Sequence, residues 1–261
     1  MLKPMLSLYK KLDNHATGLS IKLVKWTGKN REAVHPKHLI ANPGHHWYLD
    51  YLNPHDRVLD VGCGNGMHTL KAGEHCREII GIDYSTESLN LALRLAERSR
   101  VTNVRFQEAD LEGNPLPFPE ASFDKVLFLD VIEHLNEREK VLKEIKRVLK
   151  LEGILLLTAP NRDTTWKRLQ RKTGLSSFAD PDHKIEYSQA ELIEEVSRMG
   201  FRLQGEPMPI VYDTPFAGWI DLTGGISLRL YARLARWKRS CAERCPEETT
   251  GWRMVAEVMT R

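Results

Sequence analysis

The stretch from Val58 to Gly66 constrains the fold of this chain more than any other segment. A short apolar run, rich in β-branched residues, leads directly into a turn with glycines at positions 62, 64 and 66. An apolar run without alternation is typical of a parallel strand that is covered on both faces. Glycine permits positive φ and lets a ligand approach the main chain closely. The segment therefore predicts an α/β protein that binds a small molecule at the end of this strand.

The pattern that follows supports a parallel sheet with connecting helices. Apolar strand patterns alternate with helical spacing between about residues 57 and 159. The predicted strands are 57–61, 78–82, 103–107, 124–129 and 153–159, and the predicted helices between them are 86–100 and 137–150. Later, Ser188 is a cap for a helix that ends at Gly200, and strands are expected from Phe201 and over 252–259.

The spacing of the glycines separates two classes of nucleotide ligand. Dinucleotide-binding domains need a third glycine at the position that Met67 occupies here. With Asp60 on the strand, the stretch resembles motif I of the class I S-adenosylmethionine-dependent methyltransferases. The resemblance implies a Rossmann-like, seven-stranded, mostly parallel sheet with an antiparallel last strand and helices on both faces. It also implies that the cofactor contacts Asp60, Gly62, Cys63, Gly64 and Gly66.

Acidic residues follow the next three strands. The resemblance implies that Asp83, with Tyr84 beside it, accepts hydrogen bonds from the cofactor ribose. Asp110 and the amide of Leu111 would bind the adenine, and Asp130 would lie near the methionine part. Each aspartate alone could equally cap a helix or begin a loop. Three of them at the carboxyl ends of successive strands indicate a common ligand site.

A second group of residues is a candidate for proton transfer or metal binding. Asp130, Glu133 and His134 share a face if the segment forms a helical turn. Together with His183, this segment resembles the Mg²⁺ or Zn²⁺ site of ubiquinone-pathway O-methyltransferases and of small-RNA 2′-O-methyltransferases. That resemblance implies catalytic roles for Glu133, His134 and His183, which would also be the metal ligands. The chain departs from the pattern because Asp130 replaces a glutamate, and His134 acting as a metal-free base, or packing beneath the cofactor, is the alternative.

The charge of the chain is unevenly distributed. The net charge is +3 overall, but residues 1–40 carry +6 and residues 226–244 carry +5, so the rest carries −8. Both basic segments have helical apolar spacing, at Leu2, Met5, Tyr9 and Leu12 and at Leu230, Leu234 and Trp237. Such helices pack against their own domain or lie on an anionic membrane surface.

These patterns predict the domain organisation. A basic helical extension is expected over 1–44, and a methyltransferase domain over 45–261, with a substrate or cap region at about 160–187 and a basic helical insertion at about 213–250. In the cap region, basic and aromatic residues could grip a sugar or phosphate, or form a solvated helix face; they are Trp166, Lys167, Arg168, Arg171, Lys172 and Phe178.

Composition also bears on location. The four cysteines lack zinc-site spacing, which favours free thiols in a reducing cytosol. We find no apolar run long enough for a spanning helix and no convincing signal peptide. The expected location is cytoplasmic, with peripheral membrane contact through the basic helices left open.

The expected function is S-adenosylmethionine-dependent methyl transfer to a small-molecule, lipid or glycan acceptor, at oxygen. One alternative is an RNA 2′-O-methyltransferase, although nucleic acid is the less expected partner. The other alternative is a non-catalytic, methyltransferase-like module that binds membranes or partner proteins.

Overall fold

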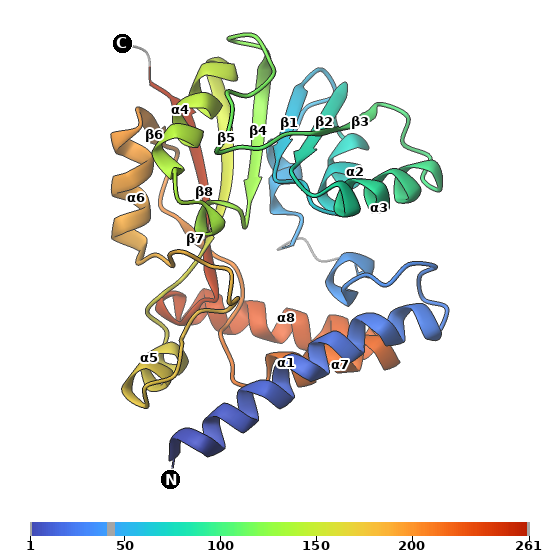
Figure 1. Cartoon of the computed structure of the whole chain (residues 1–261), viewed down its shortest axis with the longest axis vertical. Coiled ribbons are helices and arrows are strands. Elements are labelled where there is room, and N and C mark those ends of the chain that lie inside the picture. Colours follow the sequence, from blue (N-terminus) through green and yellow to red (C-terminus); the bar gives the residue numbers. More distant parts are fainter. Residues whose placement is uncertain (1, 41–44, 260–261) are drawn as a thin grey trace. The chain divides into compact units, whose positions relative to one another are not determined.

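The computed structural model describes residues 2–40 and 45–259, which form two compact units (Figure 1). The sheet unit comprises His46–Pro160, Asp180–Met208 and Trp252–Arg261. The helical unit comprises Met1–His45, Asn161–Ala179 and Pro209–Gly251. Each unit is described separately below.

The sheet has the order β3-β2-β1-β4-β5-β8-β6, and the short β7 pairs with β8. The strands are β1 (Arg57–Val61), β2 (Glu78–Asp83), β3 (Val104–Glu108), β4 (Phe123–Leu129), β5 (Leu149–Pro160), β6 (Phe201–Leu203), β7 (Met208–Pro209) and β8 (Gly251–Val258). The pairs β1–β2, β1–β4, β2–β3 and β4–β5 are parallel, whereas β6 and β8 are antiparallel. The predicted mostly parallel sheet with an antiparallel last strand is confirmed. The strand count is eight rather than seven because β7 adds a two-residue pairing on β8.

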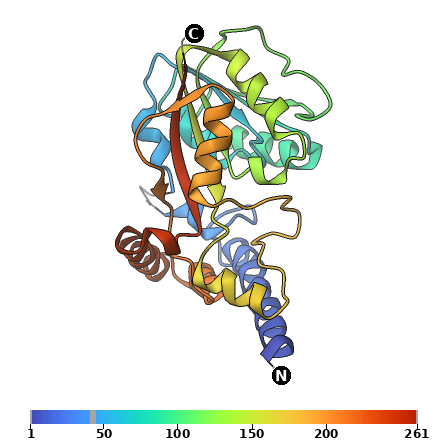
Figure 2. The same ribbon diagram turned by 90° about the vertical axis from the view of Figure 1, so that its left-hand side faces the viewer.

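Both faces of the sheet are buried, as the unbroken apolar strands predict. Leu155 and Leu157 of β5 pack in one cluster, while Leu156 between them packs in the other. The first cluster includes α4 (Arg138–Val148) and α6 (Gln189–Arg198), which lie on one side of the sheet (Figure 2). The second includes α2 (Met67–Gly73) and the short helix Trp47–Tyr51. Helix α3 (Thr86–Glu97) begins at Ser85, whose side chain accepts a hydrogen bond from the Ser88 amide.

The helical unit is built around α1 (Leu2–Trp26), α7 (Ala217–Ile226) and α8 (Leu228–Arg244). Asp13 of α1 accepts hydrogen bonds from the amides of Gly218 and Trp219 at the start of α7. Further along, Thr17 donates to Asp221 and Thr27 donates to the carbonyl of Gly225. Residues later in α1 contact residues later in α7, so the two helices run in the same direction. In the described residues, none of these helices has the length and apolarity to cross a bilayer.

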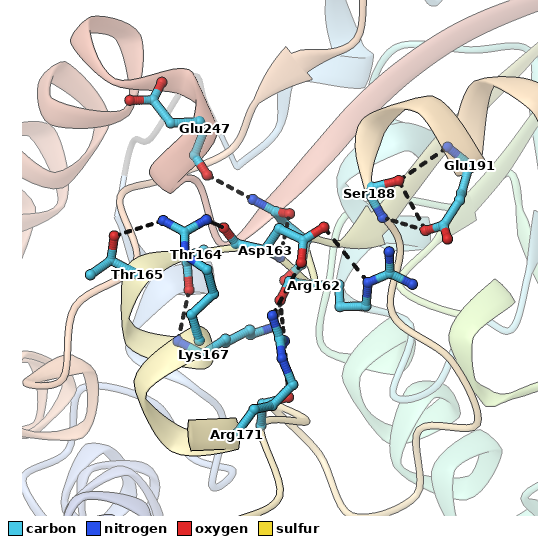
Figure 3. Close-up of polar contacts among 12 residues, drawn as sticks. Arg162, Asp163, Thr164, Thr165, Lys167, Arg171, Ser188, Glu191 and Glu247 are labelled. Atoms are coloured by element: carbon cyan, nitrogen blue, oxygen red, sulfur yellow. Dashed lines mark hydrogen bonds and ion pairs between the residues drawn. The ribbon is translucent and has the colours of Figure 1, made fainter. Parts of the chain in front are cut away.

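Helix α5 (Thr165–Lys172) also belongs to the helical unit, and its basic residues are held locally (Figure 3). Lys167 donates to the carbonyl of Asn161, Arg171 donates to the carbonyl of Arg162, and Arg168 pairs with Glu248. Three of the cap-region cations therefore bond to acceptors of the same unit.

Candidate functional site

The glycine turn between β1 and α2 has the left-handed backbone that its sequence predicts. Gly62 and Gly66 both have φ of 73°, and Gly64 has φ of 52°. A Cβ atom on Gly62 would lie 2.5 Å from a methyl group of Val131, so a side chain there would be both strained and crowded. Gly62 is therefore required by the backbone conformation and by the close packing of Val131.

Asp83, at the end of β2, fastens this turn. One carboxylate oxygen accepts a hydrogen bond of 2.8 Å from the Gly64 amide, and the other accepts one of 2.9 Å from the Ser85 amide. A carboxylate has about four lone-pair positions, so two remain for a diol. The residue therefore supports the turn and presents acceptors for two hydroxyl groups.

Asp60 lies on β1 and is not among the residues that line the cavity described below. Its side chain is buried and accepts a hydrogen bond of 2.6 Å from Thr69 of α2. Burial, as the main cause, and the charge of Asp83 raise the pKa of Asp60 to about 7. The neighbouring Cys63 is also buried, and burial raises the pKa of its thiol. Neither side chain lines the cavity, so cofactor contact by these two residues stays a prediction.

Asp130, directly after β4, has a left-handed backbone with φ of 57°. A non-glycine residue in this region usually carries strain that its surroundings must hold in place. Here the Thr158 hydroxyl does so, since it donates to the Asp130 carboxylate and accepts from the Asp130 amide. This backbone carries the chain past the glycine turn towards His134.

A cavity of about 670 Å³ opens at the carboxyl ends of the parallel strands. This volume lies within the ~300–1,000 Å³ typical of small-molecule sites. Seven of the predicted site residues line it, namely Gly62, Asp83, Tyr84, Asp110, Leu111, Asp130 and His134. The lining also includes residues that the sequence did not single out, namely Ser85, Ser88, Glu112, Val131, Leu135, Asn136, Asp182 and Lys184.

Glu112 is the most informative of these additional residues. Its carboxylate accepts hydrogen bonds of 2.6 Å from the amides of Asn136 and Glu137, just before α4 begins. Glu112 therefore ties the loop after β3 to the loop after β4 across one wall of the cavity. The sequence gives little indication of this role for Glu112, because glutamates are common in loops. The amides that Glu112 binds are also 24 and 25 residues away in the chain.

Glu133, His134 and His183 come together at the edge of this cavity. Each offers a ligand atom, and these atoms all lie within 4.8 Å of one another. Glu133 is almost completely buried, and its Oε1 lies 3.9 Å from Nε2 of His183. The other ring nitrogen of His183, Nδ1, lies 3.0 Å from the carboxylate of Glu186. Three of the four residues expected to converge are thus close together, whereas Asp130 is not in this group; of the three, His134 lines the cavity.

The environment of His134 favours the neutral imidazole. Partial burial, followed by the electrostatic influence of His183, lowers the pKa of His134 below its usual value. A neutral imidazole can accept a proton or bind a metal ion. This chemistry suits His134 as a base or as a metal ligand, and packing beneath the cofactor stays the third possibility from the sequence.

The three residues also have the character of a metal site. A ligating histidine usually holds its second nitrogen against a carboxylate, and Glu186 stands in that position beside His183. One carboxylate and two imidazoles are ligands that suit Zn²⁺, whereas Mg²⁺ prefers oxygen ligands. The residues therefore fit a divalent cation.

The fold and the cavity define a class I, Rossmann-like methyltransferase domain. A family model described as a methyltransferase domain matches residues 52–212. The chain belongs to this family of S-adenosylmethionine-dependent methyltransferases, so the predicted family is confirmed, and S-adenosylmethionine is the cofactor that the family uses.

Individual relatives agree with this assignment. An uncharacterised methyltransferase of Bacillus subtilis, YcgJ, is 32% identical over 174 residues, which are 64% of this chain and 65% of that protein. A ubiquinone biosynthesis O-methyltransferase of Paracidovorax citrulli is 32% identical over 130 residues, covering 49% and 54%. The matched part thus spans between half and two thirds of these curated relatives.

Among solved structures, the [4+2]-cyclase SpnF has a TM-score of 0.59 at 21% identity, covering 83% of this chain and 81% of its own. At this identity, the similarity concerns the fold alone. The fold is therefore shared by proteins whose names indicate different reactions.

Proposed function

We propose that the protein transfers a methyl group from S-adenosylmethionine to an oxygen atom of a small-molecule, lipid or glycan acceptor. The observation that carries the proposal is the position of His134. It lines the same cavity as the glycine turn and Asp83, and its lowered pKa keeps it in the base form near neutral pH. The curated relatives named ubiquinone biosynthesis O-methyltransferase support a hydroxylated aromatic compound as the first acceptor to test.

S-adenosylmethionine supplies a methyl group that is bonded to a cationic sulfur atom. When the methyl group is transferred, the sulfur keeps the electron pair of the broken carbon–sulfur bond. The residues of this chain then have two tasks. Asp83 and Asp110 hold the nucleoside, so that the acceptor oxygen can be placed in line with the methyl group. His134 takes the hydroxyl proton as the new carbon–oxygen bond forms.

The Glu133, His134 and His183 cluster allows an alternative mechanism in which a metal ion activates the acceptor hydroxyl. A divalent cation bound by Glu133, His134 and His183 would lower the pKa of the acceptor hydroxyl. In that case His134 is a ligand rather than the base, and Glu186 orients His183. Chelation separates the two forms, because it abolishes turnover only in the metal-dependent one.

The direct test is a methyl-transfer assay with labelled S-adenosylmethionine. A panel of catechols, hydroquinones, lipids and sugars is incubated with the full chain, with and without a chelator. Methylation at oxygen is the expected result. Methylation at nitrogen or carbon only, or none with any acceptor, would contradict the proposal.

Cofactor binding is tested separately with an Asp83→Asn variant and calorimetry. Hydrogen bonds to a charged group contribute about 1.5–3 kcal/mol, so affinity for S-adenosylmethionine should fall roughly 10- to 100-fold. Asp50→Asn, on an exposed residue outside the cavity, is the matched control and should bind as the wild type does. Equal affinities in all three proteins would show that Asp83 does not hold the ribose.

The RNA 2′-O-methyltransferase alternative receives less support from the described residues. Nucleic-acid binding depends on cationic side chains that can reach phosphates. Lys167, Arg168 and Arg171 instead bond to carbonyl groups and carboxylates of their own unit. The cap region is therefore the weaker basis for a nucleic-acid partner.

A further inference from the structure

The helical unit exposes an apolar surface that methyl transfer does not require. On the outer side of α1, apolar residues recur at intervals of three, four and seven, and three of them are strongly exposed. Met5 is 67% exposed, Leu8 is 61% and Trp26 is 71%, and Leu12 between them is 48% exposed. Met5, Leu8 and Leu12 share a helix face because they are three, four and seven residues apart, and Trp26 lies on the same side because it follows Leu12 by fourteen residues, close to four full turns. We call these four residues the α1 stripe. From Met5 to Trp26 the stripe is about 30 Å long, at ~1.5 Å per residue.

Helix α7 adds a second stripe on the same side. Trp219 is 45% exposed and Ile226 is 70% exposed, and they are seven residues apart. On α7 these residues follow Gly218 and Gly225, which contact α1. On α1, Leu12 precedes the contact residue Asp13, and Trp26 precedes Thr27. α1 and α7 run in the same direction, and each residue is rotated by about 100° from the one before it. The residue before a contact on α1 and the residue after the contact on α7 therefore point to the same side of the helix pair. The two stripes therefore form one surface, which we call the α1/α7 face.

The exposed charged residues of α1 and α7 are all basic. Lys11, Lys22 and Lys25 are exposed residues of α1 beside the stripe. The only acidic residues in α1 and α7 are Asp13 and Asp221, and both are engaged between the helices. An apolar stripe bordered by lysines complements an anionic lipid surface, where the apolar side chains enter the acyl boundary and the lysines meet phosphate groups. Lysine is well suited to this position because its aliphatic stem spans the interface.

We propose that the α1/α7 face binds the surface of anionic phospholipid bilayers. The apolar side chains supply the burial, and the lysines supply the preference for negative headgroups. Helix α8 is not part of this face as it is defined here. Its contact with α7 includes a hydrogen bond from the Tyr231 hydroxyl to Asp221, and its own exposed apolar residues, Leu230 and Trp237, are tested separately below.

The experiment uses the full chain with vesicles of phosphatidylcholine, with and without phosphatidylglycerol. Co-sedimentation should be strong with the anionic vesicles and should weaken as salt is added. Leu8→Gln with Leu12→Gln should lower the partition constant by about tenfold or more, since two apolar side chains no longer enter the bilayer. Lys11→Gln with Lys22→Gln should reduce the preference for phosphatidylglycerol and the salt sensitivity of binding, because two of the three lysines beside the stripe are lost.

Two paired variants serve as controls for this surface. Leu93→Gln with Leu151→Gln changes two exposed leucines of the sheet unit, and Leu230→Gln with Trp237→Gln changes the exposed residues of α8. Both should bind vesicles within about twofold of the wild type, a change too small to count as loss of an apolar anchor. Far-ultraviolet circular dichroism and the melting temperature establish that each variant is folded.

Three results would overturn the proposal. The first is that the wild type binds neither kind of vesicle. The second is that the α8 variant, and not the α1 variant, loses binding. The third is that light scattering finds a dimer that Leu8→Gln with Leu12→Gln dissociates, because the face would then belong to a second copy of the chain. None of these results depends on methyl transfer, so they are distinguishable from failure of the proposed function.

Discussion

His134 shows how two neighbouring imidazoles set the proton chemistry of a site. The rings of His134 and His183 are 4.8 Å apart, and His183 is among the causes that lower the pKa of His134. The base form of His134 therefore predominates above a pH of about 6.5, the ordinary pKa of histidine. Turnover by a metal-free enzyme should be level well above this pH and should fall as the pH drops through the lowered pKa.

The prediction is tested by pH–rate profiles of three proteins. His134→Gln should lower kcat by about 10²- to 10⁴-fold, the usual contribution of a general base. His183→Asn removes a neighbour that lowers the pKa of His134, so the acidic limb should move to higher pH. His75→Gln, on an exposed residue outside the cavity, is the control. An acidic limb that stays in place in His183→Asn would rule out this coupling.

The ionisation of Asp60 is linked to folding stability. Its pKa rises from an ordinary 3.8 to about 7 because of burial, so the folded state holds a proton that the unfolded chain loses. Its contribution to stability is fully present below about pH 3.8 and is lost as the pH rises through about 7. The shift of about three units corresponds to at most roughly 4 kcal/mol.

Asp60→Asn removes this titration and keeps an acceptor for Thr69. The free energy of unfolding, measured in urea at pH 5 and pH 8, should therefore fall less with pH in the variant than in the wild type. Asp50→Asn should keep the wild-type dependence. Parallel pH dependences in all three proteins would mean that Asp60 is ionised in the folded state.

At the scale of elements, the contact between α1 and α7 depends on the absence of a side chain at Gly218. A Cβ atom there would lie 1.9 Å from the carbonyl oxygen of Asp13, whereas one at Gly18 of α1 would meet nothing within 4 Å. Gly218 thus lets the two helix backbones approach each other, and Gly18 is an ordinary exposed position in a helix.

The two glycines provide a matched pair of substitutions. Gly218→Ala should destabilise the protein by about 1–3 kcal/mol, because the helices must separate. Gly18→Ala should stabilise it by roughly 0.5–1 kcal/mol, because alanine is the better helix former. Thermal and urea unfolding measure both changes. Equal effects of the two substitutions would show that α1 and α7 are not in close contact.

Elements could be predicted from the sequence where local pattern and tertiary pairing agree. The strand predicted over 57–61 is β1, and the helix predicted from Ser188 is α6. The capping box of Ser188 and Glu191 explains the second result, because it is a local signal (Figure 3). By contrast, the helix predicted over 137–150 ends at Val148, where β5 begins. Pairing of Leu149 with Phe123 of β4 overrides the helical spacing there.

The residues of the site also differ in how well the sequence predicts them. The aspartates that line the cavity follow strands directly, so the topology of a parallel sheet already places them together. Glu112, Asp182 and Lys184 belong to loops whose positions depend on tertiary contacts. Sequence spacing carries no information about those contacts, and the walls of the cavity were therefore beyond prediction.

At the scale of the whole molecule, the helical unit is assembled from three separate stretches of chain. The chain passes from one unit to the other at residues 45/46, 160/161, 179/180, 208/209 and 251/252. Charge and amphipathic spacing indicated α1 and α8 separately, and they did not single out α7 within the predicted insertion. Their common packing rests on contacts such as Tyr9 with the carbonyl of Pro215, which are 206 residues apart in sequence.

These repeated passages limit how the protein can be re-engineered or can diverge. A recombination event with one breakpoint cannot replace the helical unit, because it would carry along part of the sheet or leave a helix behind. Removing only the first forty residues would strip α7 of the helix it packs on and uncover a backbone normally hidden at Gly218. Transplanting the unit into a related enzyme would require three coordinated grafts, so its variation is expected to proceed by single substitutions on its outer surface.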